Sequence, residues 1–137
     1  MPLTVSAGEP SRALNDLNIL VVEDEEPMRS LLARMLQRLR VATVIEAESG
    51  AQGLAEVGAR PLDLVICDWN MPEMSGMEFF DRVHAQNPDL PFLMVTGRSD
   101  AGSIVAAKRA GISAYIVKPI SQRELKAKIQ FVLGTES

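Results

Sequence analysis

Short apolar runs alternate along this chain with longer stretches in which apolar residues recur every three or four positions. The apolar runs are rich in Val and Ile, and several contain almost no polar residue, which is typical of parallel strands buried on both faces. They predict five strands, which we place at Asn18-Val22, Thr43-Glu46, Asp63-Cys67, Pro91-Val95 and Ala114-Val117.

The stretches between these runs predict five helices. The first begins near Pro27, buries apolar residues from Met28 to Leu39 and carries four arginines, Arg29, Arg34, Arg38 and Arg40. Three others begin with capping-box patterns, at Ser49-Gln52, Ser75-Glu78 and Ser121-Glu124. The remaining helix runs from about Asp100 to Arg109, and Gly111 is well placed for a left-handed cap. This alternation predicts an α/β fold with a parallel sheet, because each strand must return through a right-handed helical crossover.

Polar residues cluster where the predicted strands end. Glu23 and Asp24 follow the first strand, Asp68 the third, Thr96 the fourth and Lys118 the fifth. In an open parallel sheet, the C-terminal ends of the strands border the crevice that binds ligands. Carboxylates brought together repel one another unless a cation lies among them, and such oxygen ligands suit Mg²⁺. The pattern therefore predicts a site for Mg²⁺ and a phosphoryl group.

Length and charge narrow the class of protein. The 137 residues suit one domain, and a formal net charge of −4 leaves no basic stripe for direct nucleic-acid binding. No stretch resembles a membrane span or a secretory signal, and the lone Cys67 suits a reducing compartment, so we expect a cytoplasmic protein. We expect a flexible tail over residues 1–16, a folded domain over 17–134 and a short tail over 135–137.

Four spaced segments, ILVVEDEE, VICDWNMPEMSG, LMVTG and AYIVKPI, resemble the receiver domain of two-component response regulators, especially its stand-alone chemotaxis type. The resemblance covers roughly residues 17 to 133. It implies a flavodoxin-like, doubly wound sheet with strand order 2-1-3-4-5. It also implies that Asp68 accepts a phosphoryl group from a histidine kinase or a histidine phosphotransfer protein, and that a downstream protein reads the result.

The resemblance assigns roles around Asp68, the nucleophile that would form an acyl phosphate. Asp24 would hold Mg²⁺ directly and Glu23 through water, with Asp68 itself and the backbone carbonyl of Asn70 as further ligands. The ammonium of Lys118 would neutralise phosphoryl charge, since phosphoryl transfer depends mainly on positioning and charge stabilisation.

The resemblance also implies a switch. Thr96 would donate its hydroxyl to a phosphoryl oxygen, and Tyr115 matches the aromatic residue that rotates into the space behind it. The surface formed by the fourth helix, fifth strand and fifth helix would then change for a downstream partner. Arg98 and Asn70 occupy positions that tune the lifetime of the acyl phosphate in the family. Gly97 stands where the family usually has a small residue such as Ala or Ser, which would leave the phosphoryl pocket more open to water. As in the family, the peptide bond before Pro119 is expected to be cis.

Other functions stay open beside this interpretation. A phosphatase resembling the haloacid dehalogenases would carry Asp where Asn70 stands, and it would need a general acid that the sequence lacks. A scaffold that is never phosphorylated would have no need for clustered charge. A receiver could also act as a phosphorelay intermediate or a phosphate sink. We expect a phosphoacceptor that catalyses its own phosphotransfer and dephosphorylation, not an enzyme.

Several residues also have ordinary structural explanations. Tyr115 can be a core aromatic residue, and Cys67 is best explained as a small buried hydrophobe. His84 has no ligand partners at metal spacing, so we expect it to face solvent. The arginines of the first helix are most simply a solvated face, although the resemblance places kinase docking partly on this helix.

Overall fold

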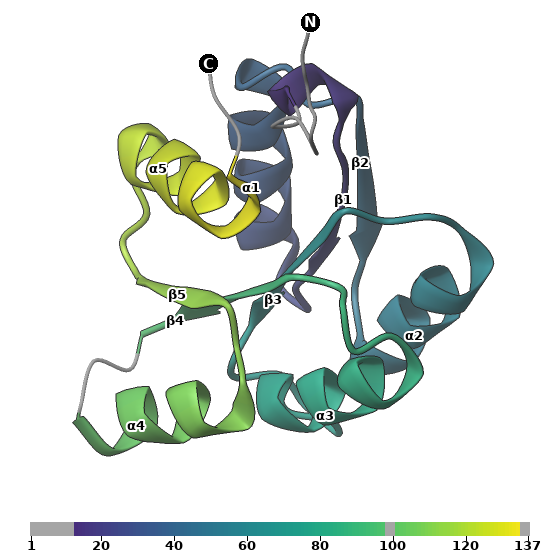
Figure 1. Ribbon diagram of the computed structural model, residues 1–137, viewed down its shortest axis with the longest axis vertical. Helices are drawn as coiled ribbons and strands as arrows, with labels where there is room; N and C mark the ends of the chain where they lie inside the picture. Colours follow the sequence, from purple (N-terminus) through teal and green to yellow (C-terminus); the bar gives the residue numbers. More distant parts are fainter. Residues whose placement is uncertain (1–12, 98–100, 135–137) are drawn as a thin grey trace, which may run out of the picture.

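Five parallel strands form one sheet in the computed structural model, which describes residues 13–97 and 101–134 (Figure 1). The strand order is β2-β1-β3-β4-β5, as the resemblance implied, and helices alternate with the strands throughout. The elements are β1 (Asn18–Val22), α1 (Glu26–Arg38), β2 (Thr43–Ala47), α2 (Gly50–Ala59), β3 (Leu64–Asp68), α3 (Gly76–Gln86), β4 (Phe92–Thr96), α4 (Ala101–Ala110), β5 (Ala114–Val117) and α5 (Gln122–Leu133).

The strands β3 and β4 lie one residue later than predicted. Asp63 precedes β3 and is tied to the start of β1, because its carboxylate accepts a hydrogen bond from the backbone N–H of Asn18, at 2.7 Å. Pro91 has no N–H to donate to the sheet. At the other end, Trp69 N–H donates to the carbonyl of Val95 at 2.9 Å, which keeps the chain extended through Asp68. The shift places Asp68 and Thr96 inside the strands.

Alternating strand residues build two cores, one on each face of the sheet. Ile19 and Val21 of β1 pack in the core formed with α1 and α5, whereas Leu20 and Val22 pack in the core on the other face, which contains residues of α3 and α4. Figure 1 shows α1 and α5 together on one side of the sheet and α2, α3 and α4 on the other. Because helices cover both faces of the sheet, a ligand can reach the side chains that lie at the C-terminal ends of the strands.

All three predicted serine caps accept a backbone hydrogen bond, but only the capping box at Ser75 and Glu78 is reciprocal. At Ser75 and Glu78 the capping box is complete, and Ser121 accepts a hydrogen bond from the backbone N–H of Glu124. Ser49 likewise accepts from the N–H of Gln52, at 3.1 Å. The Gln52 side chain, however, accepts from the N–H of Glu48, at 2.6 Å, so this box is not reciprocal. Gly111 has a φ of 94° and ends α4 as predicted.

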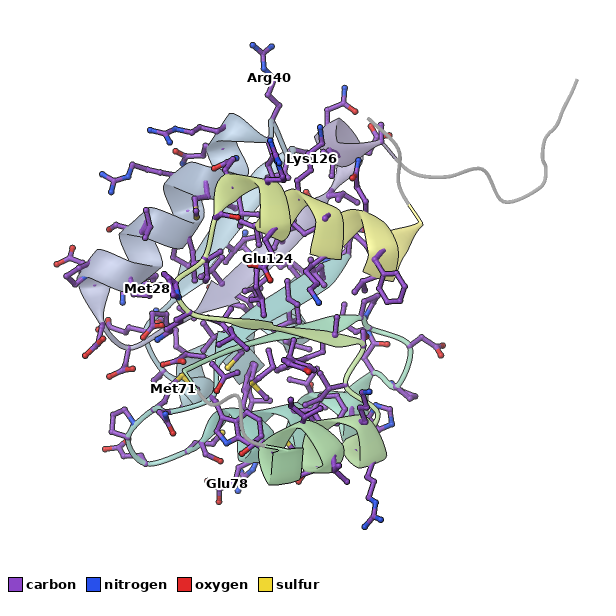
Figure 2. The ribbon with its side chains drawn as sticks, turned by 90° about the vertical axis from the view of Figure 1, so that its left-hand side faces the viewer. Met28, Arg40, Met71, Glu78, Glu124 and Lys126 are labelled. Carbon is purple, nitrogen blue, oxygen red and sulfur yellow. The ribbon has the colours of Figure 1, made fainter. Side chains whose placement is uncertain are left out.

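The N-terminal boundary of the packed region lies earlier than the expected start at residue 17. Residues 14–16 form a 3₁₀ helix, and Leu14 is buried in the core on the α1 and α5 side. At the far end of α1, Arg40 projects away from the body of the protein (Figure 2). Among the described residues, none of the helices combines the length and the apolarity that crossing a membrane requires.

Candidate functional site

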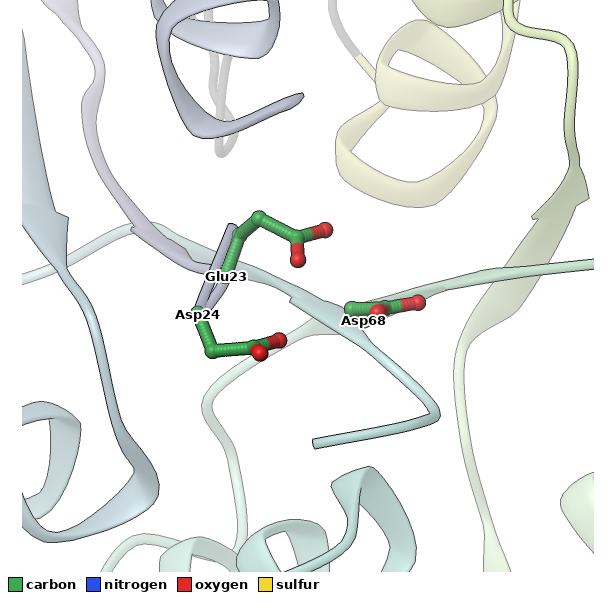
Figure 3. A group of neighbouring side chains, drawn as sticks. All are labelled: Glu23, Asp24 and Asp68. Carbon is green, nitrogen blue, oxygen red and sulfur yellow. The ribbon is translucent and has the colours of Figure 1, made fainter. Parts of the chain in front are cut away.

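Three carboxylates meet where β1 and β3 end. Glu23 and Asp24 follow β1 directly, and Asp68 is the last residue of β3, its neighbour in the sheet. One carboxylate oxygen from each residue lies within 4.8 Å of the others. Figure 3 shows the three side chains together at the ends of these strands. The sequence prediction that these side chains converge is therefore confirmed.

Lys118 joins this group from the end of β5. Its Nζ lies 3.4 Å from Oδ1 of Asp68, and its backbone N–H donates to the carbonyl of Thr96 at 2.8 Å. The peptide bond between Lys118 and Pro119 is cis, as expected. The arrangement places one ammonium against the carboxylate at the centre of the group.

Thr96 and Tyr115 lie on one face of the sheet. Met94 of β4 is buried on the α3 and α4 side and pairs in register with Tyr115 of β5. Thr96, two residues after Met94, shares that face because strand side chains alternate. Thr96 is buried, whereas Tyr115 is half-buried and has Nζ of Lys128 at 5.7 Å from its ring centroid.

Burial raises the pKa of both Glu23 and Asp68. Burial, followed by the charge of Asp68, raises the pKa of Glu23 from 4.5 to about 7, against the lowering effect of a hydrogen bond from the Glu25 backbone. Burial also raises the pKa of Asp68, although the nearby Lys118 ammonium lowers it. A cation placed among the carboxylates would favour their charged forms.

One oxygen of this group lacks a hydrogen-bond donor. Oε2 of Glu23 accepts from the N–H of Glu25 at 3.2 Å, but its buried Oε1 has no partner among residues 13–97 and 101–134. A buried acceptor left unpaired is costly, and a hydrated divalent cation would satisfy it. The donor set of three carboxylates therefore fits a hard divalent metal ion.

A glycine allows the chain to pack behind Asp68, a feature that the sequence analysis did not single out as functional. A Cβ on Gly76, the first residue of α3, would overlap the backbone carbonyl of Asp68 and lie 2.8 Å from Cα of Trp69. The N–H of Gly76 donates to the carbonyl of Trp69 at 2.7 Å. The start of α3 thus fixes the backbone that carries Asp68. Its signal in the sequence was the glycine directly after the Ser75 cap.

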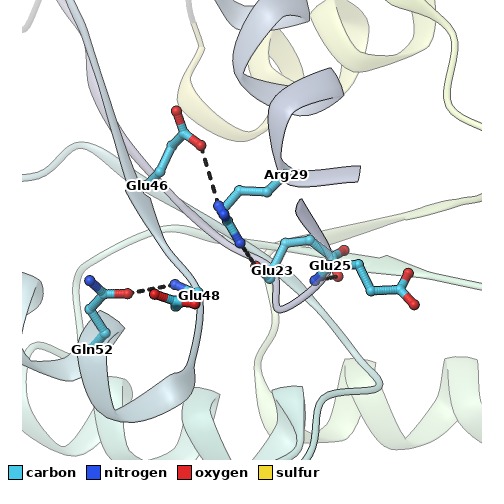
Figure 4. A network of polar contacts seen from close by, with 6 residues as sticks. All are labelled: Glu23, Glu25, Arg29, Glu46, Glu48 and Gln52. Carbon is cyan, nitrogen blue, oxygen red and sulfur yellow. Dashed lines mark hydrogen bonds and ion pairs between the residues drawn. The ribbon is translucent and has the colours of Figure 1, made fainter. Parts of the chain in front are cut away.

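The expectation of a solvated arginine face on α1 is wrong for Arg29. Arg34 and Arg38 are exposed, but the Arg29 side chain is only 15% exposed. Its Nη1 donates to the backbone carbonyl of Glu23 at 2.9 Å, and its Nε lies 3.3 Å from Oε1 of Glu46 (Figure 4). Helical periodicity alone could not separate this arginine from the others, because its partners lie on β2 and on the segment that follows β1.

The remaining candidates are placed as follows. Cys67 is buried, and burial raises the pKa of its thiol, which agrees with a packing role. His84 is exposed and stacks on Phe80, as expected for a solvent-facing residue. Asn70 is exposed in the segment that follows β3. Arg98 lies outside the described residues, so its predicted role stays a prediction.

The sequence matches a known protein family over most of its length. A family model described as the response regulator receiver domain matches residues 19–130. The chain is 37% identical over 122 residues to chemotaxis protein CheY1 of Helicobacter pylori, covering 87% of this chain and 98% of the relative. It is 38% identical over 124 residues to the chemotaxis protein CheY homolog of Campylobacter jejuni, covering 88% and 95%.

Solved structures agree with these sequence matches. Chemotaxis protein CheY4 of Vibrio cholerae superposes with a TM-score of 0.81 at 30% identity, covering 86% of this chain and 99% of the other. A CheY-like response regulator receiver domain protein from Methanospirillum hungatei superposes with a TM-score of 0.80 at 29% identity, covering 87% and 94%.

Proposed function

Since the chain belongs to the response regulator receiver family, we propose that it is a phosphorylation switch whose phosphoacceptor is Asp68. The observation that carries this proposal is the placement of Asp68, with Lys118 Nζ 3.4 Å from its Oδ1 and two further carboxylates beside it. The proposed donor is a phosphohistidine on a histidine kinase or on a histidine phosphotransfer protein.

The proposed reaction is an in-line transfer. An oxygen of Asp68 attacks phosphorus, the phosphorus–nitrogen bond of the donor breaks, and the leaving imidazole takes a proton. Lys118 stabilises the charge on the transferred oxygens. Asp24, Asp68, the carbonyl of Asn70 and, through water, Glu23 would hold Mg²⁺, which supplies neutralising charge when bound. The same residues then support hydrolysis of the acyl phosphate, so the protein resets itself without being a turnover enzyme.

The proposed output surface consists of α4, β5 and α5. The Thr96 hydroxyl would bond a phosphoryl oxygen, and Tyr115 would follow into the space that Thr96 leaves, by a shift between two conformations. A pocket of about 330 Å³ supports this assignment, because Tyr115, Lys128 and Phe131 line it together with residues of α4. A change at Tyr115 would therefore alter a surface that a partner can contact.

The names of the relatives bear on the output pathway. The relatives are named chemotaxis proteins, so we place a motility target first and a phosphorelay or a phosphate sink second. The proposed location of these events is the cytoplasm.

Arg98 and Asn70 would set the lifetime of the acyl phosphate, and Arg98→Ala should change its decay rate without preventing its formation.

The proposal is tested with the single tryptophan, Trp69, which adjoins Asp68. Titration with Mg²⁺ and then acetyl phosphate should change the fluorescence of Trp69, and intact mass should show one added phosphoryl group. Asp68→Asn should add none. The wild-type protein failing both to bind Mg²⁺ and to gain mass would replace this function with a scaffold role, and multiple turnover of a phosphate ester would favour the phosphatase alternative.

A further inference from the structure

The geometry points to Arg29 as a positioning residue for the cation site, an inference that rests on the proposed function. We propose that its guanidinium fixes the peptide between Glu23 and Asp24, and that Glu46 holds the guanidinium in place. Arg29 touches neither the phosphoryl group nor the metal in this arrangement. It acts through the backbone that carries two of the three carboxylates.

The contacts of Arg29 tie three elements together. Arg29 belongs to the first turn of α1, its Nη1 donates to the carbonyl of Glu23 just after β1, and its Nε reaches Glu46 on β2 (Figure 4). Glu46 follows Ile45, which is buried on the opposite face, so its side chain lies on the α1 side of the sheet. The Glu23 carbonyl is held by the backbone, whereas the Glu46 side chain is 44% exposed, so the carbonyl is the partner that restricts the guanidinium more.

The bonded carbonyl belongs to the peptide plane that connects Glu23 to Asp24. The N–H of Glu23 is already held by the carbonyl of Ala47, at 3.0 Å, as an extension of the sheet. The Arg29 bond fixes the following peptide, and the N–H of Glu25 closes the segment by donating to Oε2 of Glu23. Rotation of the peptide between Glu23 and Asp24 would redirect both carboxylates, and the bond from Arg29 opposes it.

The hydrogen bond of Arg29 and its charge have opposite expected effects on the affinity for Mg²⁺. A guanidinium near three carboxylates lowers their attraction for a cation, so its charge alone disfavours metal binding. Its hydrogen bond, in contrast, holds the ligands in one arrangement and favours metal binding, as groups that support metal ligands commonly do. Removing Arg29 therefore distinguishes the two effects by the sign of the change in affinity.

Lysine cannot replace this function, although it keeps the charge. The guanidinium is planar and donates in two fixed directions, which here reach the Glu23 carbonyl and the Glu46 carboxylate. A lysine ammonium is a single point on a flexible stem. Arg29→Lys is therefore the variant that removes the geometry and retains the charge.

The experiment measures the dissociation constant of Mg²⁺ by Trp69 fluorescence, without phosphodonor, for wild type, Arg29→Lys, Arg29→Gln and Arg34→Gln. Arg34 is exposed on the same helix, so its variant matches the loss of one α1 charge. The melting temperature of each metal-free variant is measured in parallel, and the titrations are made well below it. A purely structural role would lower the melting temperature and leave the affinity of the folded protein unchanged.

We expect Arg29→Lys and Arg29→Gln to weaken Mg²⁺ binding by about tenfold, and Arg34→Gln to change it by less than about twofold because surface charge is screened. Wild-type affinity in Arg29→Lys, or tighter binding in Arg29→Gln, would overturn the inference while leaving the proposed function intact. Absence of Mg²⁺ binding by the wild-type protein would instead remove both.

Discussion

Two regions of the molecule are built in opposite ways. One is the acidic cluster of Glu23, Asp24 and Asp68, and the other is the β5 face, which we define as Tyr115 of β5 with Lys128 and Phe131 of the adjoining α5. Glu23 and Asp68 are buried, and the backbone around them is held by the sheet, by Arg29 and by the start of α3. On the β5 face, Tyr115 is half-buried beside a pocket, and Phe131 is 77% exposed.

This difference fits the two proposed roles, phosphoryl transfer at the acidic cluster and partner binding at the β5 face. Carboxylates that must hold a cation and accept a phosphoryl group work best in a fixed arrangement, since reorganising them would raise the barrier to transfer. A surface that reports the event needs room for a side chain to move and apolar area that a partner can cover. The predictions below change residues of each region and measure the effect on Mg²⁺ binding, phosphorylation or stability.

Lys118→Met should have the largest effect, since it should slow phosphorylation and at the same time strengthen Mg²⁺ binding. Phosphoryl incorporation from acetyl phosphate should slow by about 100-fold or more, because the ammonium at Asp68 is lost. Mg²⁺ should bind more tightly, because a competing positive charge has left the acidic cluster. Stopped-flow fluorescence and intact mass measure both. The control is Lys108→Met on α4, and weaker Mg²⁺ binding in Lys118→Met would contradict this account.

Gly76→Ala should destabilise the protein, whereas Gly97→Ala should not. The Cβ at position 76 would overlap the carbonyl of Asp68, and such overpacking costs about 1–3 kcal/mol. Among the residues that the structure describes, the new Cβ at position 97 meets no heavy atom within 4 Å. Urea unfolding gives the free energies, and Mg²⁺ affinity should fall only in the first variant. Equal stability of the two variants would show that the backbone behind Asp68 can yield.

The metal-free protein should become more stable as the pH falls toward 5. The pKa of Glu23 is raised on folding from 4.5 to about 7, so the folded protein binds this proton more tightly than the unfolded chain. Its contribution is fully present below the unfolded pKa and is lost as the pH rises through the folded pKa. Melting temperatures in chelator at about pH 5.5 and about pH 7.5 should differ by a few degrees more in wild type than in Glu23→Gln. A pH dependence that Glu23→Gln leaves unchanged would assign it to other groups.

Phe131→Ser should have the smallest effect of all. Because Phe131 is 77% exposed, the free energy of unfolding should change by about 0.5 kcal/mol or less, and Mg²⁺ affinity should stay at the wild-type value. The matched control is Phe79→Ala in the core, which should cost about 3–5 kcal/mol. Chemical denaturation compares the two. A large loss in Phe131→Ser would mean that the β5 face is part of the packed core.

Much of the site could be predicted because its residues stand at strand ends. Apolar runs mark the strands of a buried parallel sheet, and the polar residues that follow them must meet at one edge. Glu23, Asp24, Asp68 and Lys118 were found in this way, and the structure places them together. The repeated βα pattern also determined the fold class, since parallel strands require helical crossovers.

Tertiary structure alone decided the contacts between elements distant in sequence. Nothing local distinguishes Arg29 from Arg34, because its partners are the carbonyl of Glu23, which follows β1, and the carboxylate of Glu46 on β2. Gly76 is visible in the sequence as the glycine after the Ser75 cap, but its missing Cβ matters only because the Asp68 backbone passes behind it. Sequence periodicity fixes which residues are buried and where strands end, whereas the exact direction of a guanidinium or the clearance behind a helix depends on how the elements pack.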